Sequence, residues 1–406
     1  MAGVVILLLQ MLSFMFITVV LLLAGMAVVY QCWVWPVGAN QRLKKNGFSG
    51  PPPVFPLGNI KEMIKNRPRK TMKGTLNDES SEYLSLNISH DIHSTVFPFF
   101  SQWRQRYGKV FVYWLGTEPF LYIGDPEFLN QVASGVVSKA WGKPTVFKRD
   151  WKSLFGTGLN MTEGEDWARH RHIIAPAFSP KNLKGMMSIM LDSTNQMLDK
   201  WSRLVGTNRA EINVERSLTC NAADIIAKTS FGTSDLQHRQ KVTEKLQAIQ
   251  LMLFQSKRMV GVPFNKYIHP LKTLESRKLG KEIDDLILAI IISRKTGGRS
   301  TSRPAGNDLL SLLMAENEKN GGVGKKLTDR ELVDECKTFF FGGVETTALA
   351  VSWTLLLLAQ HPDWQKRLGE EIKEVTGGQS LDFNMLPKLE KRAIHRSEAS
   401  AVASYM

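Results

Sequence analysis

The first 41 residues contain no charged side chain, and this constrains the fold more than any other feature of the sequence. Residues 4–30 are almost wholly apolar. As a helix they would extend about 40 Å, which exceeds the roughly 30 Å hydrocarbon core of a bilayer. An aromatic belt and a basic cluster follow: Tyr30, Trp33, Trp35, Arg42, Lys44 and Lys45. We therefore predict one transmembrane helix and juxtamembrane segment in residues 1–41, with the body of the chain in the cytosol and the N-terminus in the lumen.

A cleaved signal peptide is the alternative, and residues 24–27 offer a possible cleavage site. A signal peptide would need a basic N-terminal region and a shorter apolar stretch, and neither is present. Asn87 and Asn160 each begin a glycosylation pattern. A cytosolic body predicts that both stay unmodified.

The overall charge and the cysteines exclude some classes of function. The net charge of +14 suits membrane lipid or an acidic partner, but the basic residues are scattered and no nucleic-acid motif is present. We therefore expect no nucleic-acid binding. Cys32, Cys220 and Cys336 are too few and too far apart for a disulfide framework, which fits a reducing compartment.

Three consecutive prolines at residues 51–53 follow the basic cluster. Such a segment cannot be helical and forms a stiff, extended spacer. The spacer could fix how the body leans on the membrane, or it could be an ordinary linker. Composition alone leaves both interpretations open.

The rest of the chain predicts one mostly α domain (α+β) over residues 42–391, with a small β-sheet. Residues 109–115 and 120–123 have the alternation and the intervening turn of a β-hairpin. Helical spacing dominates afterwards, at residues 126–134, 164–174, 179–204, 218–230, 242–255, 274–293, 308–317, 329–360 and 362–375. A small sheet followed by a run of helices is typical of a single α+β or mostly α domain. Residues 65–94 are polar and could form a flexible insertion.

The helix predicted at residues 329–360 is unusual in length and composition. Thr328 and Glu331 form a capping-box pattern at its start. Its 32 residues would extend about 48 Å, enough to cross a whole domain. Apolar residues occur on most of its sides, which predicts a central, buried helix.

The middle of this helix contains Gly342 and Gly343, followed by Glu345 and Thr346. Adjacent glycines cost roughly 1 kcal/mol each in a helix but let a flat ligand lie against the backbone. The Thr346 hydroxyl can bond the Gly342 carbonyl four residues earlier, which predicts a local bulge. A carboxylate beside a hydroxyl in an apolar cavity outlines a proton relay. The alternative is a kinked core helix whose glutamate is solvated or paired.

A second candidate pair is Trp167 and Arg171, four residues apart on one face of a predicted helix. An indole donor beside a guanidinium is suited to hold a carboxylate. Without further context the pair would be an ordinary basic surface helix.

The motifs together resemble the cytochrome P-450 family. The sequence GGVETT at residues 342–347 resembles the family's oxygen-activation motif (A/G)Gx(D/E)T(T/S), and WARHR at residues 167–171 matches its WxxxR motif. The anchor and the three prolines resemble the leader and hinge of microsomal members. The sequence ECKTFFF at residues 335–341 and APAF at residues 175–178 resemble the plant branch that contains cytokinin hydroxylases and gibberellin-modifying enzymes.

The resemblance implies a haem-dependent monooxygenase in the endoplasmic reticulum membrane, with one membrane span. Such an enzyme would hydroxylate a small apolar substrate with O2, using electrons from an NADPH-dependent flavoprotein reductase. Glu345 and Thr346 would be catalytic. Trp167, Arg171, Gly342 and Gly343 would contact the haem, with the first two at a propionate.

The sequence departs from the family pattern after residue 391. No glutamate has an arginine three residues later, so the family's ExxR pair is absent, and no cysteine follows Cys336 to ligate iron. Residues 392–406 are rich in alanine and serine, as an aberrant tail from a splice variant or a faulty gene model would be. Cys220 is expected in the core. The alternative function is therefore a truncated, haem-free and catalytically inactive membrane protein.

Overall fold

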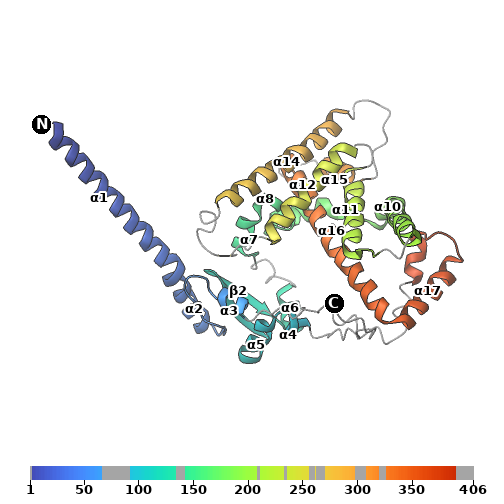
Figure 1. Cartoon of the computed structure of the whole chain (residues 1–406), viewed down its shortest axis with the longest axis horizontal. Coiled ribbons are helices and arrows are strands. Elements are labelled where there is room, and N and C mark those ends of the chain that lie inside the picture. The colour runs from blue at the N-terminus through green and yellow to red at the C-terminus, as the bar shows by residue number, and fades with distance from the viewer. Residues whose placement is uncertain are drawn as a thin grey trace. The chain divides into compact units, whose positions relative to one another are not determined.

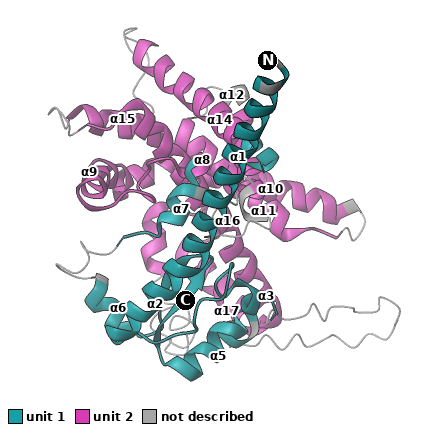
Figure 2. Ribbon diagram, turned by 90° about the vertical axis from the view of Figure 1, so that its left-hand side faces the viewer, with its two compact units in different colours: residues 1–152, 253–275 teal, residues 153–252, 276–406 magenta. Residues whose placement is uncertain are grey.

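The computed structural model describes residues 2–65, 92–133, 142–207, 211–232, 236–255, 261, 270–297, 308–319 and 326–389 (Figure 1). Four predicted features lie outside these residues: most of the insertion at 65–94, the glycosylation pattern at Asn87, the end of the predicted domain at 390–391 and the tail at 392–406. The chain divides into two compact units (Figure 2). Unit 1 comprises residues 1–152 and 253–275, and unit 2 comprises residues 153–252 and 276–406.

Unit 1 begins with the predicted apolar helix, α1 (Ala2–Val29), visible as the long blue helix in Figure 1. One turn of π-helix at Tyr30–Val34 joins it to α2 (Trp35–Lys45) without a break. Among the described residues, two helical stretches are long and apolar enough to cross a membrane, Val5–Lys45 and Asp329–Gln360. The first is near the N-terminus, and none of its most apolar part is buried inside the structure, as a membrane anchor requires.

The body of unit 1 is built on the predicted hairpin. Strands β1 (Val110–Leu115) and β2 (Glu118–Ile123) pair antiparallel, with Val110 opposite Ile123 and Leu115 opposite Glu118. Short helices surround it: α3 (Ile60–Lys65), α4 (Ile92–Val96), α5 (Pro98–Tyr107), α6 (Pro126–Ala133), α7 (Thr145–Asp150) and the start of α8 (Lys152–Phe155). Its core is aromatic, because Phe99 and Trp103 of α5 pack on Phe111 of β1.

The proline-rich segment is a fixed part of the hairpin and not a free linker. Gly50, with φ +153°, lies so close to β1 that a Cβ there would be 1.9 Å from the Val112 carbonyl oxygen. The buried Asn59 side chain donates to the Pro52 carbonyl and accepts from the Trp114 amide, at 2.9 and 2.8 Å. The proline-rich segment is therefore attached rigidly to the body of unit 1, as a spacer that fixes the body would be and an ordinary linker would not.

Unit 2 consists of helices. In chain order these are α9 (Gly164–Ile174), a 3-10 turn at Ala175–Phe178, α10 (Pro180–Thr207), α11 (Val214–Phe231), most of α12 (Leu236–Gln255), most of α14 (Pro270–Gly297), α15 (Leu309–Lys319), α16 (Asp329–Gln360), α17 (Pro362–Thr376) and a 3-10 turn at Phe383–Met385. All nine helices predicted from residue 126 onward are present, with ends shifted by a few residues. The prediction of a mostly α fold with a small sheet is confirmed.

Apolar residues at helical spacing form the core of unit 2. Ile283, Ile287 and Ile291 repeat every four residues on α14 and are fully buried. Leu246 and Ile249 of α12 are buried in the same way. α11 packs along α16, where Leu218, Ala222 and Ala348 form a common cluster (Figure 1). Apolar residues three or four positions apart thus lie on one helix face, as the sequence pattern predicted.

The predicted long helix has the expected start, length and end, but only part of it is buried. The capping box is complete, since Thr328 and Glu331 each accept a backbone N–H of the other. The prediction of a central, buried helix is wrong for the C-terminal half: Trp353 is 56% exposed, and Leu349 and Leu356 are also exposed. The described neighbours, chiefly α11, cover one side of α16 and leave its C-terminal half open.

Candidate functional site

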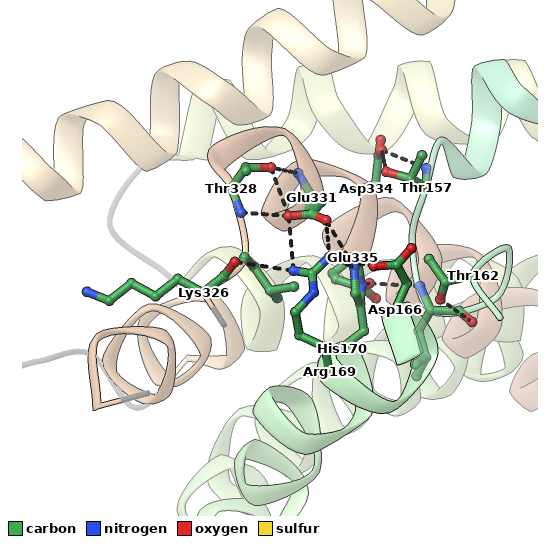
Figure 3. A network of polar contacts seen from close by, with 12 residues as sticks. Thr157, Thr162, Asp166, Arg169, His170, Lys326, Thr328, Glu331, Asp334 and Glu335 are labelled. Carbon is green, nitrogen blue, oxygen red and sulfur yellow. Dashed lines mark hydrogen bonds and ion pairs between the residues drawn. The ribbon is translucent and has the colours of Figure 1, made fainter. Parts of the chain in front are cut away.

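The predicted site residues lie on two helices of unit 2, α9 and α16. The start of α16 is joined to α9 by a polar network (Figure 3). Farther along α16, the Phe339 ring lies 5.2 Å from the ring of Phe178, which belongs to the 3-10 turn after α9. The side chains that make these contacts are not the predicted ones but their neighbours in the sequence.

Thr346 makes the predicted bond within α16. Its hydroxyl donates to the Gly342 carbonyl at 2.6 Å. The predicted local bulge is wrong, however, because α16 stays α-helical from Asp329 to Gln360. A carbonyl oxygen has two lone pairs, so it can accept the hydroxyl without giving up the helical geometry.

The two adjacent glycines have different surroundings, because successive helical residues point about 100° apart. A Cβ on Gly342 would meet nothing within 4 Å, so this position faces open space. A Cβ on Gly343 would lie 2.4 Å from the Ile226 side chain of α11. The close packing of α11 on α16 therefore requires Gly343, while Gly342 is the position where a ligand could approach the backbone.

Glu345 is exposed and hydrogen-bonded to a residue that sequence reasoning missed. Gln250 of α12 donates its amide N–H to Glu345 Oε2 at 2.5 Å. Gln250 and Glu345 are separated by 95 residues in the chain, so no local pattern could have found the pair. The bond fixes the direction of the carboxylate beside Thr346.

Trp167 and Arg171 both lie on α9, as predicted, and both are exposed. Trp167 is 43% exposed, an unusual exposure for a tryptophan in a packed helical body. The two side chains are one helical turn apart and project from the same face. This arrangement leaves an indole N–H and a guanidinium available to a carboxylate ligand.

The opposite face of α9 is bound to α16 through Arg169. The Arg169 guanidinium lies 2.5 Å from Glu331 Oε1 and also donates to the Lys326 carbonyl at 3.2 Å. Glu331 is at the same time the capping residue of α16, accepting the Thr328 amide at 2.7 Å. One carboxylate thus caps α16 and attaches α9 to it (Figure 3).

His170 makes a second link between the two helices and is completely buried. Its Nδ1 lies 2.6 Å from Glu335 Oε1, and its Nε2 lies 3.2 Å from Glu331 Oε1. The same Glu335 oxygen accepts the Leu159 amide at 2.7 Å. Local patterns could not reveal this pairing, because a histidine in WARHR reads as one more basic surface residue.

The network changes the pKa of Glu331, of Glu335 and of His170. Burial opposes ionisation of Glu331, but hydrogen bonds from Arg169 and Thr328 outweigh it and lower its pKa to about 2. Burial raises the pKa of Glu335, and the His170 bond offsets this only in part. Burial also disfavours a charged His170, but the bond to Glu335 and the two nearby carboxylates outweigh it and raise its pKa.

A separate group of ion pairs surrounds Lys337 of α16. Lys337 is completely buried, and its ammonium lies 2.7 Å from Asp284 of α14 and 2.7 Å from Asp334. Asp334 also accepts the Thr157 amide at 2.8 Å. Within the part of the chain that the structure describes, no group of three or more His, Cys, Asp or Glu side chains is arranged to hold a metal ion.

The three cysteines differ in their surroundings. Cys336 is buried, and burial raises the pKa of its thiol to about 12, which keeps it protonated. Cys32 is buried beside the apolar anchor. The prediction that Cys220 lies in the core is wrong: it is exposed on α11, because the buried face of that helix passes through Leu218 and Ala222, about 200° away.

Comparisons with known proteins identify the family of this chain. The cytochrome P450 family model matches residues 84–391. A cytokinin hydroxylase of Arabidopsis thaliana is 32% identical over 365 residues, 88% of this chain and 67% of the relative. Cytochrome P450 709B1 of Arabidopsis thaliana is 33% identical over 93% of this chain and 71% of its own length. Cytochrome P450 714B1 of Oryza sativa subsp. japonica is 30% identical over 89% of this chain and 67% of its own length.

The helical fold and the match across most of the chain define the class: this chain belongs to the cytochrome P450 family. It spans about two thirds of the length of these relatives.

The family implies a haem with a cysteine thiolate ligand, and the residues present fit only part of such a group. Open space at Gly342 and the exposed pair on α9 suit a flat cofactor that carries carboxylates. No cysteine of the chain suits the iron. Cys336 is a buried neutral thiol on the same helix as Gly342, and it lies six residues earlier, about 9 Å along the axis. As a whole, the chain does not fit a thiolate-bound haem.

Proposed function

We propose that the activity class of this protein is the oxidative hydroxylation of a small apolar substrate, with O2 and electrons from an NADPH-dependent flavoprotein reductase. Family membership supports the reaction class, and a relative named cytokinin hydroxylase supports a small substrate. We assign Glu345 and Thr346 as the residues that hold and pass a proton. The Gln250 bond to Glu345, beside a threonine hydroxyl directed along the helix, supports this assignment.

We further propose that, if haem binds, Trp167 and Arg171 would hold one of its propionates and Gly342 would leave room beside the backbone. The exposed position of the first two on one face of α9 supports their role. Gly343 has a tight neighbour on α11, so we assign it to helix packing with only an indirect part in cofactor binding.

The second candidate function applies to the 406-residue chain itself: a membrane protein without haem and without monooxygenase activity. The observation that carries this candidate is the state of the cysteines: Cys336 is a buried neutral thiol, Cys32 is buried beside the anchor, and Cys220 is on the exposed face of α11. Extraction and quantification of haem from the purified chain tests it, together with the absorbance of the reduced protein under carbon monoxide. We expect no thiolate-type band.

Two variants sharpen this test. A stoichiometric haem with a thiolate-type band would overturn the haem-free candidate, and Cys336→Ser and Cys220→Ser would then identify the ligand. Arg171→Gln is the control for weak haem retention without a thiolate. Such haem should dissociate faster from this variant if Arg171 contacts a propionate, and at an unchanged rate if it does not.

We propose that the chain resides in the endoplasmic reticulum membrane, with a single span and a cytosolic body. The uncharged α1 and the basic residues at the end of α2 support this orientation. Protease added to intact microsomes should digest the body. Full protection of the body, or a glycan on Asn160, would contradict the orientation.

A further inference from the structure

Four large apolar side chains are exposed where the anchor meets the body of unit 1. Trp33 and Trp35 are each 46% exposed, Val54 is 52% exposed and Phe55 is 45% exposed. The first two lie at the junction of α1 and α2, and the other two belong to the proline-rich segment. A soluble surface rarely keeps so much apolar area together without a partner.

The two sets of residues are in contact, although the contacting pair, Trp33 and Phe55, is 22 residues apart in the chain. The rings of Trp33 and Phe55 pack edge to face with their centroids 6.2 Å apart. Beside Trp33, Cys32 and Pro36 are buried, whereas the residues described in α1 are exposed throughout. The body of unit 1 therefore covers one side of the helix at this level, and Val54 and Phe55 are at the edge of that cover.

The proline-rich segment holds these two residues in a fixed position. Its N-terminal end is tied to β1, because the Val112 amide donates to the Ser49 carbonyl at 2.8 Å. Its C-terminal end is tied by Asn59, which accepts the Trp114 amide. Phe55 therefore cannot move away from Trp33 without disturbing the hairpin.

The height of this apolar surface along the anchor agrees with the edge of a bilayer. α1 has 28 residues, which extend about 42 Å, close to the roughly 40–45 Å of a bilayer with its headgroups. Trp33 follows four residues after the end of α1, at the level of the headgroups. Tryptophan is enriched there, because its ring is apolar and its N–H is polar.

Basic side chains surround the same level. The Arg42 guanidinium lies over the Trp35 ring, 5.7 Å from its centroid, and so reaches back toward the N-terminal end of the helix. Lys44 and Lys45 follow and are exposed. Cations beside aromatic rings at the end of a membrane helix complement acidic lipid headgroups.

We propose that Val54 and Phe55 enter the lipid interface beside Trp33 and form a second membrane contact, flanked by basic residues that bind acidic headgroups. This inference rests on the proposed membrane anchoring by α1. The contact would fix the hairpin of unit 1 against the membrane surface, because the proline-rich segment ties the hairpin to both inserted residues.

The test uses the full chain in vesicles, with a fluorescent NBD label on Val54→Cys in a Cys220→Ser background. Cys32 and Cys336 are buried, so the introduced thiol is the accessible one. In equimolar phosphatidylcholine–phosphatidylserine vesicles we expect blue-shifted emission, quenching by headgroup-level spin-labelled lipid and protection from iodide. Gln105→Cys, on an exposed residue of α5, is the control and should emit as in water and be quenched by iodide.

Phe55→Cys provides a second reporter if the first variant folds poorly, and Leu12→Cys reports on α1. A deep Leu12 label with a water-exposed Val54 label would overturn this inference alone, and would leave the surface free for a protein partner. A water-exposed Leu12 label would overturn the proposed anchoring. In phosphatidylcholine alone the blue shift of the Val54 label should decrease, and an equal shift in both vesicles would exclude the role of acidic headgroups.

Discussion

Glu331 joins α9 to α16, and replacing it with glutamine tests whether its charge stabilises the fold. The side chain caps α16, pairs with Arg169 of α9 and lies beside His170. Glutamine has nearly the same shape and can still accept the Thr328 amide. Glu331→Gln therefore removes the negative charge and keeps most of the packing.

The size of the effect follows from the pKa of Glu331. The folded state lowers it from 4.5 to about 2, and each unit is worth about 1.4 kcal/mol, so ionised Glu331 stabilises the fold by about 3–4 kcal/mol. Because the folded-state pKa is the lower one, this stabilisation is complete above pH 4.5 and disappears as the pH falls toward 2. At pH 3 about 1–2 kcal/mol should remain.

Urea titrations of the full chain in detergent micelles, followed by far-UV circular dichroism, measure the free energy of unfolding. Between pH 3 and pH 6 the difference between wild type and Glu331→Gln should grow from about 1–2 to about 3–4 kcal/mol. His170 has a raised pKa in the folded state and stays protonated in this range. Glu370→Gln, on an exposed glutamate of α17, should change stability by less than about 0.5 kcal/mol. A difference that does not depend on pH would refute the electrostatic account.

Two further substitutions test other contacts. Gly50→Ala should destabilise the hairpin by about 1–3 kcal/mol, seen as faster hydrogen exchange of the Val112 amide. Gly47→Ala is the control, because Gly47 also has a positive φ but no neighbour within 4 Å of its Cβ position, and equal effects would show that the close approach is unimportant. Lys337→Met should lower the free energy of unfolding by about 3–5 kcal/mol, since it leaves the buried Asp334 with only the more distant, exposed Arg330 at 3.5 Å as a cation. A loss below about 1 kcal/mol in urea titration would mean that water reaches this pair.

Local patterns predicted the helices and the hairpin well, because each depends on neighbours in the sequence. The capping box is an example, since Thr328 and Glu331 are three residues apart and both halves of it are present. The spacing of Thr346 and Gly342 predicted their hydrogen bond in the same way. The exposure of Cys220 could also have been predicted from the positions of the buried residues on either side of it.

Contacts between distant segments could not be predicted in this way. Glu331 and Arg169 are 162 residues apart, and nothing near either one specifies the other. The same holds for Gln250 and Glu345. Two adjacent glycines also look alike in a sequence, and only the position of α11 shows that Gly343 is tightly packed while Gly342 faces open space.

The two faces of α9 have a consequence for how mutants of this protein are read. Arg169 and Arg171 are two residues apart, and an alanine at either position would be expected to weaken the binding of a ligand held by α9. The Arg169 variant would weaken it by loosening the helix, so low temperature or a stabilising osmolyte should restore binding. The Arg171 variant would lack the contact itself, so no change of conditions that only favours folding should help. Recovery of binding at low temperature or with an osmolyte thus distinguishes a residue that supports the binding helix from a residue that contacts the ligand.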